Sequence, residues 1–266
     1  MRPAPVPPGH RVSLRGNDAA PPPGLPRDLH AATDTLLDRL ADLQAALYAE
    51  RTRAVLIVIQ GRDASGKDAT IKTVCGTFNA QGCVVTSFKA PTATELAHDY
   101  LWRAHRAMPA RGMIGVFNRS HYEDVLAVRV LRLVPRSMWA RRYRQINEFE
   151  RMLTESGTTI VKVCLHVSKA EQRRRLLERL ANPKKSWKFS EDDLIARAHW
   201  QEYTRAYRDM LARCSTPWAP WYVIPADERH ARNYLVANVL NAAFERLRPR
   251  YPTLDPTLVK RMKRVV

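Results

Sequence analysis

Apolar residues along the chain follow two alternating patterns. Short, nearly continuous apolar runs, typical of buried strands, occur at 54–60, 83–88, 113–117, 158–167 and 221–225. Between and around them, apolar positions recur every three or four residues, as on one face of a helix, at 30–50, 66–79, 92–107, 120–132, 137–155, 168–182, 190–213 and 228–247. This alternation predicts a mostly parallel five-stranded sheet covered on both faces, a three-layer α/β/α fold whose ligands bind at the carboxyl ends of the strands.

The two ends of the chain depart from this pattern. Residues 1–26 hold eight of the 18 prolines and almost no periodic apolar positions. We therefore expect residues 1–28 to form an extended, poorly ordered arm that drapes over a neighbouring surface. Residues 251–266 predict a basic tail, which leaves 29–250 as one α/β domain.

Charge adds more to this picture than overall composition does. The 266 residues are 45% hydrophobic, enough for a substantial core, and 44 Lys and Arg against 26 Asp and Glu give a formal net charge of +18. Such an excess indicates a polyanionic partner (nucleic acid, an acidic membrane surface or a phosphate polymer) or else a merely soluble basic surface. The four cysteines show no pairing or metal-ligand spacing, and no apolar run approaches transmembrane length, so we expect a reduced, cytoplasmic protein.

The most informative motif directly follows the first apolar run. Residues 61–67 read GRDASGK, the G-x-x-x-x-G-K spacing of a loop whose backbone N–H groups cradle phosphate at a helix N-terminus. Lys67 is expected to contact the transferred phosphoryl group. Asp68 stands where the usual motif has Ser or Thr to hold magnesium, so Asp63 becomes a candidate Mg²⁺ ligand or acceptor-positioning carboxylate. The predicted phosphate cradle consists of Gly61, Ala64, Ser65, Gly66, Lys67 and Asp68.

A second cluster of polar residues follows the third apolar run. Asn118 occupies the strand end where many phosphate-loop enzymes place a magnesium-binding aspartate, and Glu123 and Asp124, one helical turn on, are candidates for the missing carboxylate. Arg119 is expected to direct its guanidinium into the same cleft, which suits bidentate contact with phosphate. The alternative is that the acidic pair only stabilises a helix N-terminus and binds Arg119. His121 is expected to be structural.

A third, basic segment begins at about residue 170. A predicted helix rich in arginine ends near Pro183, and a Lys- and Trp-containing stretch joins it to the next helix. Such a helix–loop–helix at 170–192 is typical of a mobile lid whose arginines close over transferring phosphates, with a solvated basic helix face as the alternative. The arginines concerned are Arg174, Arg175 and Arg179. Lys89, after the second strand, is a further candidate for the cleft.

Together these motifs resemble the type-two polyphosphate kinases, which are polyphosphate-dependent nucleotide phosphotransferases. The resemblance covers about residues 30–250 and rests on GRDASGKD at 61–68, FKAP at 88–91, FNRSHYED at 117–124, RRLLERL at 174–180 and WKFS at 187–190. It implies a phosphate-loop fold of the thymidylate kinase type with a helical lid, and a requirement for Mg²⁺. It also implies catalytic roles for Asp63 and Lys67, and phosphate contacts by Arg119 and the lid arginines.

Two positions are similar to one subgroup of that family. Asn118 with Glu123, in the sequence Glu123-Asp124-Val125, resembles the third subgroup, whose members accept nucleoside monophosphates and diphosphates. The resemblance implies reversible conversion of AMP to ADP and of ADP to ATP with inorganic polyphosphate as donor. It places Asn118, Arg119 and Glu123 at the nucleotide, Asp63 and Glu123 at the metal, and Arg119 and Glu123 among the catalytic residues. The implied partners are polyphosphate and adenine nucleotides, with guanine nucleotides as a further option, in a homo-oligomer of two or four subunits, without nucleic acid or membrane.

Two other functions remain compatible with the residues. An ATP-dependent nucleotide kinase of the same fold accounts for the loop and the lid, but it gives no reason for the charge excess. A nucleic-acid-binding phosphate-loop protein accounts for the charge, but the sequence has no recognisable binding module or aromatic–basic stacking pattern. Assays with polyphosphate and with ATP as donor distinguish a polyphosphate-dependent kinase from an ATP-dependent one.

Overall fold

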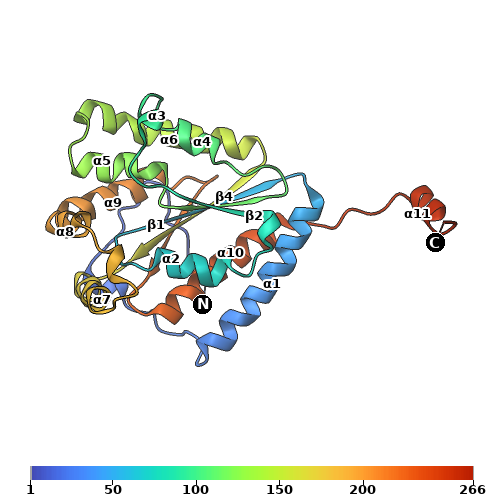
Figure 1. The fold of residues 1–266 in the computed structure, drawn as a ribbon, viewed down its shortest axis with the longest axis horizontal. Coiled ribbons are helices and arrows are strands. Elements are labelled where there is room, and N and C mark those ends of the chain that lie inside the picture. The colour runs from blue at the N-terminus through green and yellow to red at the C-terminus, as the bar shows by residue number, and fades with distance from the viewer. Residues whose placement is uncertain (1, 266) are drawn as a thin grey trace.

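The computed structural model describes residues 2–265 and confirms a parallel five-stranded sheet with helices on both faces (Figure 1). All strand pairs are parallel, in the order β2-β3-β1-β4-β5. The strands are β1 (Ala54–Gly61), β2 (Cys83–Ser87), β3 (Ile114–Asn118), β4 (Thr158–His166) and β5 (Trp221–Pro225). Their boundaries lie within about one residue of those predicted from the apolar runs, inside the usual uncertainty of strand ends.

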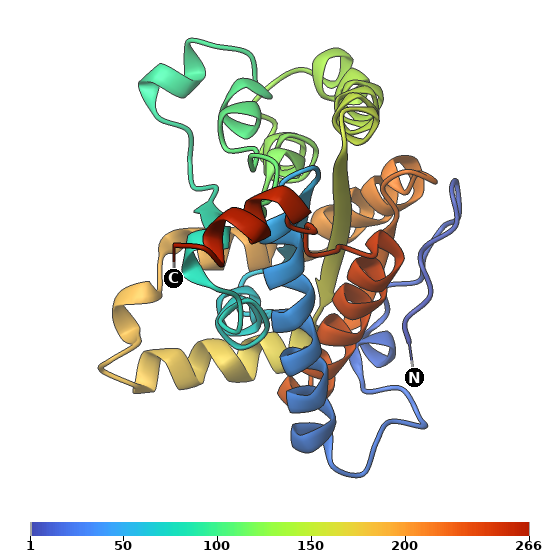
Figure 2. The same cartoon turned by 90° about the vertical axis from the view of Figure 1, so that its right-hand side faces the viewer.

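Alternate side chains of β1 explain the two helical layers. Ile57 and Ile59 contribute to a core shared with α1 and α10, whereas Leu56 and Val58 contribute to a second core shared with α6 and α9. Successive strand residues point to opposite faces, so one apolar run fills both cores. The long helices are α1 (Leu29–Glu50), α6 (Arg136–Glu155), α9 (Trp200–Cys214) and α10 (Arg229–Leu247). Figures 1 and 2 show α1 and α10 on one side of the sheet and α6 and α9 on the other.

Several predicted helices are shorter or interrupted. The remaining helices are α2 (Lys67–Thr70), which continues as a π-helix over Ile71–Cys75, α3 (Ala93–Leu96), α4 (Trp102–Arg106), α5 (Ala127–Val130), α7 (Lys169–Ala181), α8 (Glu191–Ala198) and α11 (Pro256–Met262). The predicted helix 92–107 is broken because Asp99 Oδ1 accepts the Leu101 N–H (2.9 Å) and starts a new turn. The prediction for 120–132 is wrong at Leu126 (φ −105°, ψ −86°), and that for 190–213 at His199 (φ −88°, ψ 32°). Apolar periodicity continues across both breaks and therefore did not reveal them.

The N-terminal arm lies against the domain. The Val6 N–H donates to the Trp221 carbonyl (2.8 Å), the Gly9 N–H donates to the Ala212 carbonyl (3.0 Å), and Val6 and Ala19 are buried. This course is that of an extended arm over a neighbouring surface, and the expected poor order of the arm stays a prediction. Single apolar residues anchor the arm, and these leave no periodic signal in the sequence.

The basic C-terminal segment includes helix α11, which lies apart from the rest of the domain (Figure 1). Its side chains are exposed almost throughout. Within residues 2–265, no helix combines the length and apolar character needed to cross a bilayer.

Candidate active site

The loop between β1 and α2 forms the centre of the site. Its backbone is left-handed at Ala64 (φ 60°) and Gly66 (φ 100°), a conformation that suits glycine at the second position. A Cβ on Gly61 would lie 2.6 Å from Ser65 Oγ and 2.8 Å from the Leu165 carbonyl oxygen, so only glycine fits there. This tight turn presents the N–H groups at the start of α2 to an anion.

Lys67 is folded back over the loop. Its Nζ donates to the carbonyl oxygens of Gly61 (2.7 Å) and Arg62 (3.0 Å) and lies 3.9 Å from Asp63 Oδ1. Burial lowers the pKa of Lys67, and the carboxylate of Asp63 opposes that shift. Phosphate oxygens would be stronger acceptors for this ammonium than the two carbonyl groups that now hold it.

Arg119, directly after β3, points its guanidinium at the same loop. Its backbone is left-handed (φ 59°), and its N–H donates to the Ile59 carbonyl (3.0 Å), which fixes the turn beside β1. The guanidinium pairs with Asp63. Burial acts to lower the pKa of Arg119, but Glu123 and Asp63 together raise it above its ordinary value. Asp63, Lys67 and Arg119 thus form one connected group.

Glu123 lies one turn beyond the end of β3, in a 3-10 helix over His121–Val125. Its Oε1 accepts a hydrogen bond from Nε2 of Gln60 (3.2 Å), a fully buried residue of β1. Burial and then the charge of Glu123 raise the pKa of Tyr207 on α9. The carboxylate therefore lies near enough to Arg119 to raise the pKa of that guanidinium, and its role at the metal stays a prediction.

Asp68 and Asn118 contact each other at the mouth of the loop. Asn118 Nδ2 donates to Asp68 Oδ1 (2.9 Å), and Lys188 Nζ lies 3.3 Å from Asp68 Oδ2. Burial acts to raise the pKa of Asp68, but the hydrogen bonds from Asn118 and Lys188 lower it below its ordinary value. Asp68, which stands where the usual motif has Ser or Thr, therefore joins β3 and the predicted lid segment to the phosphate loop.

The remaining polar residues of the FNRSHYED motif have structural partners. His121 is fully buried with Nε2 3.3 Å from Glu150 Oε1, and Lys162 of β4 pairs with the same carboxylate. Asp124 pairs with Arg142 of α6 (2.6 Å), and burial raises the pKa of Asp124 to about 6. The structural interpretation of His121 is confirmed, and Asp124 does not supply the missing carboxylate.

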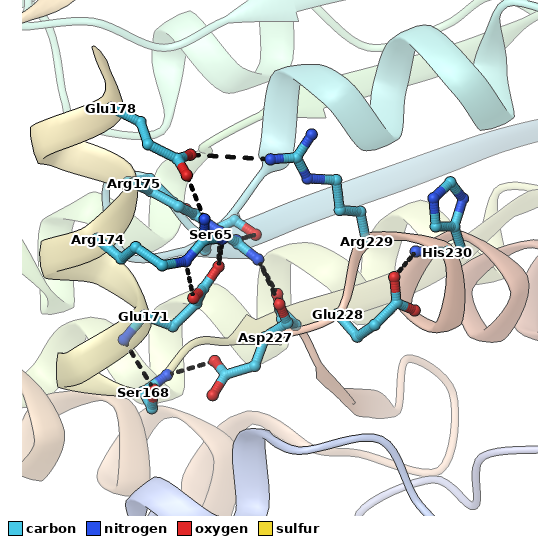
Figure 3. A network of polar contacts seen from close by, with 12 residues as sticks. Ser65, Ser168, Glu171, Arg174, Arg175, Glu178, Asp227, Glu228, Arg229 and His230 are labelled. Atoms are coloured by element: carbon cyan, nitrogen blue, oxygen red, sulfur yellow. Dashed lines mark hydrogen bonds and ion pairs between the residues drawn. The ribbon is translucent and has the colours of Figure 1, made fainter. Parts of the chain in front are cut away.

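Arg175 contacts the phosphate loop through backbone carbonyl groups. Figure 3 shows its guanidinium between Ser65 of the loop and Asp227, which follows β5. It donates to the carbonyl oxygens of Ala64 (3.0 Å), Ser65 (3.2 Å), Ala226 (2.6 Å) and Asp227 (2.9 Å), and to Oε1 of Glu171 (2.7 Å). These bonds use all of its N–H groups. Without a ligand, Arg175 therefore holds the carbonyl groups of the loop, and its expected phosphate contact stays a prediction.

The other two lid arginines differ from Arg175. Arg174 is half exposed and pairs with Glu171 and Glu178 on its own helix, which matches the solvated-face alternative (Figure 3). Arg179 Nη1 lies 3.3 Å from Oδ2 of Asp193 and so joins α7 to α8. Arg197 of α8 makes a second connection, because it donates to the Lys169 carbonyl (3.0 Å) and to Oε1 of Gln172 (3.0 Å) on α7.

Lys89 is exposed just after β2. The preceding residue, Phe88, donates its N–H to the Asn118 carbonyl (3.0 Å), which places Lys89 beside the strand end that carries Arg119. Lys89 therefore follows a segment bonded to the end of β3, and its contact with phosphate stays a prediction.

Sequence reasoning missed two arginines that contact the loop region. The guanidinium of Arg62 lies 3.8 Å from the ring centroid of Trp200 and donates to Thr204 Oγ1 (2.6 Å). Arg232 of α10 packs over Gly66. Both contacts join segments far apart in the chain, so no local spacing marks them.

The carboxyl edge of the parallel sheet carries a phosphate cradle, together with a lysine and an arginine that share one carboxylate. This arrangement defines a phosphate-loop phosphotransferase. The family model described as polyphosphate kinase 2 matches residues 27–251. The chain belongs to this family, as the sequence motifs predicted.

Similar proteins agree with this assignment. A Meiothermus ruber protein named AMP/ADP-polyphosphate phosphotransferase is 53% identical over 214 residues, 80% of each chain. A Rhodopseudomonas palustris protein named ADP-polyphosphate phosphotransferase is 45% identical over 245 residues, 88% of this chain and 85% of that one. The crystal structure of polyphosphate kinase 2 from Arthrobacter aurescens TC1 matches with a TM-score of 0.89 and 38% identity, covering 100% of this chain and 99% of the other.

Proposed function

We propose that this protein transfers the terminal phosphoryl group of inorganic polyphosphate to both AMP and ADP, in a reaction that requires Mg²⁺. The observation that carries the proposal is the shared contact of Lys67 and Arg119 with Asp63 at the phosphate loop of a polyphosphate kinase 2 family chain. The relative at 53% identity is named for AMP and ADP, which supports use of both acceptors. The net charge of +18 suits a polyanionic donor.

Lys67 and the loop N–H groups would bind the terminal phosphate of the donor. The Lys67 ammonium exchanges its carbonyl partners for phosphate oxygens and neutralises charge that develops during transfer. The acceptor's terminal phosphate oxygen attacks in line, the donor's P–O anhydride bond breaks, and the shortened polyphosphate leaves with the electron pair. One anhydride replaces another, so the direction of transfer follows the supply of each substrate.

Asp63 and Glu123 are the carboxylates that fit a magnesium ion. Within residues 2–265, no three His, Cys, Asp or Glu side chains lie close enough to enclose a metal. Mg²⁺ commonly binds through one or two carboxylates together with substrate phosphates and water, so two cleft carboxylates are sufficient. Glu123 has a neutral amide, Gln60, as its hydrogen-bond donor. When bound, Mg²⁺ would supply charge neutralisation at the phosphates.

Arg119 would contact the acceptor side of the transferring group. Its guanidinium already pairs with Asp63, and its raised pKa keeps it cationic. Lys188, which pairs with Asp68, lies on the predicted lid at about 170–192. Opening of this segment would break that exposed pair and admit the substrates.

The decisive experiment measures product from AMP and from ADP with Mg²⁺ and long-chain polyphosphate, beside reactions with ATP as donor. Product from both acceptors with polyphosphate alone is expected, and Lys67→Met should abolish it. Arg144→Ala, which removes an exposed arginine of α6, is the matched control and should retain activity. Product from ADP only would remove the dual-acceptor assignment, and product only with ATP would make the protein an ordinary nucleotide kinase.

Glu123→Gln tests the metal assignment separately. The substitution keeps the side-chain size and removes the charge, so the Mg²⁺ concentration for half-maximal rate should rise, together with the ratio of ADP to AMP activity. An unchanged magnesium curve and an unchanged ratio would remove Glu123 from the site. The expected homo-oligomer remains a prediction, which the particle mass in solution tests.

A further inference from the structure

Arg232, in the first turn of α10, covers the last glycine of the phosphate loop. A Cβ placed on Gly66 would lie 2.0 Å from Arg232 Nη1 and 2.7 Å from its Cζ. The guanidinium thus occupies the space that a side chain at this position would need. Arg232 is only 2% exposed, so its position is fixed by packing.

This guanidinium lacks the partner that a buried arginine ordinarily has. Its Nε and Nη2 donate to Oδ1 of the neighbouring Asn233 (3.2 Å and 3.0 Å), a neutral amide. Among the described residues no ion pair joins it to a carboxylate, although the charge of Glu228 acts on it and opposes the lowering of its pKa. Burial lowers the pKa of Arg232 to about 10, and the positive charges of Arg175 and Arg229 act in the same direction. An unpaired buried charge is costly, and an anion at the site would offset that cost.

Arg175 lies close by and provides a comparison, because each of its N–H groups already has an acceptor. All of its N–H groups bind backbone carbonyls or Glu171, as described above. Arg229, also in the first turn of α10, is exposed and only 3.9 Å from Glu178 (Figure 3). Of these arginines, Arg232 alone is both buried and without a carboxylate.

Lys67 and Arg232 contact opposite ends of the loop. Lys67 Nζ lies over the carbonyl groups of Gly61 and Arg62, where the loop begins, and Arg232 lies over Gly66, where it ends. Residues 63–65 of the loop lie between these two ends in the sequence. An extended chain of phosphates that starts at Lys67 and crosses the loop would therefore reach Arg232 with its next phosphates.

We propose that Arg232 binds the donor phosphate chain beside the phosphate held by Lys67, and thereby provides a second donor subsite. This inference rests on the proposed use of polyphosphate. It assigns to α10 a substrate contact that the sequence motifs assigned to the arginines of α7. Its Nη1 would donate to phosphate oxygens, and the anion would neutralise a charge that now has only an amide for a partner.

The test compares Arg232→Ala and Arg232→Lys with Arg246→Ala, which changes an arginine at the opposite end of the same helix. A charge-assisted hydrogen bond to phosphate predicts that Arg232→Ala raises the KM for polyphosphate roughly 10- to 100-fold. The KM for AMP should change less than about twofold, and Arg232→Lys should recover part of the loss because it restores a point charge. Arg246→Ala should match the wild type.

A binding measurement without nucleotide separates this proposal from a general loss of activity. Titration of tripolyphosphate into each protein should show weaker binding for Arg232→Ala only, and the ligand-free variant should melt at or above the wild-type temperature. An unchanged KM and unchanged tripolyphosphate binding would overturn the subsite, as would a parallel rise in the KM for AMP. Wild-type protein that makes no product from polyphosphate would instead overturn the proposed function, whatever the variants do.

Discussion

Replacing Arg175 with methionine should destabilise the phosphate loop before any substrate binds. The side chain is largely buried and connects α7 to the loop and to the residues after β5. Breaking a buried, hydrogen-bonded charge network costs about 3–5 kcal/mol. Methionine fills most of the space, and water can reach some of the freed carbonyls, so we expect a loss of about 3 kcal/mol. For a domain of this size that loss lowers the Tm by about 6–12 °C.

The assay is thermal unfolding of the ligand-free protein, together with hydrogen exchange of the amides in residues 61–66. Arg174→Met is the control, because Arg174 is the adjacent residue on the same helix, is half exposed and contacts only side chains of α7. Its Tm and loop exchange should match the wild type. A wild-type Tm for Arg175→Met with a raised KM for polyphosphate would refute the reasoning. In that case Arg175 would act on phosphate, as the lid motif suggested.

Three further substitutions test other parts of the structure. Lys67→Met should lower turnover by at least about 100-fold because it removes a charge that stabilises the transferring phosphoryl group, while unfolding experiments show an unchanged fold. Lys162→Met leaves Glu150 buried without its lysine partner and should lower the free energy of unfolding, measured by urea denaturation, by about 3–5 kcal/mol. If the double variant Lys162→Met/Glu150→Gln recovers most of that loss, the unpaired charge is its cause. Arg53 lowers the pKa of Glu50 to about 2, so this contact stabilises the fold above the ordinary pKa of 4.5 and loses its effect as the pH falls towards 2. The Tm difference between wild type and Glu50→Gln should therefore shrink between about pH 6 and about pH 3, and a constant difference would exclude the contact as a source of stability.

The sheet was predictable because the apolar runs have the length and continuity of strands buried on both faces. Residues 54–60 fill both cores of the structure, so their continuous apolar pattern has a direct physical cause. Helix interruptions were harder to predict. The break near Asp99 depends on one side-chain hydrogen bond, and the breaks at Leu126 and His199 depend on backbone angles that apolar spacing does not report.

Whether a site residue was predictable also depended on whether its contacts are local or distant in the sequence. Asp63 and Lys67 share one loop, so the spacing GRDASGK was enough to bring them together. Arg119 was predictable because it follows the strand that pairs with β1. Arg175 was placed on the correct helix, but helix periodicity does not specify which carbonyls a long side chain reaches. Arg232 had no motif at all, since only the folded chain brings α10 to the loop.

The arm's partners impose an order on folding. Ser215 Oγ donates to the Val6 carbonyl across a separation of 209 positions, and the arm's other contacts include the backbone of Trp221 in β5. During synthesis the arm therefore leaves the ribosome long before the surface that binds it exists. Closing so long a loop is entropically costly until the intervening domain has formed. The arm should consequently attach last, cover the outer edge of β5 only in the finished molecule, and detach first when the protein unfolds.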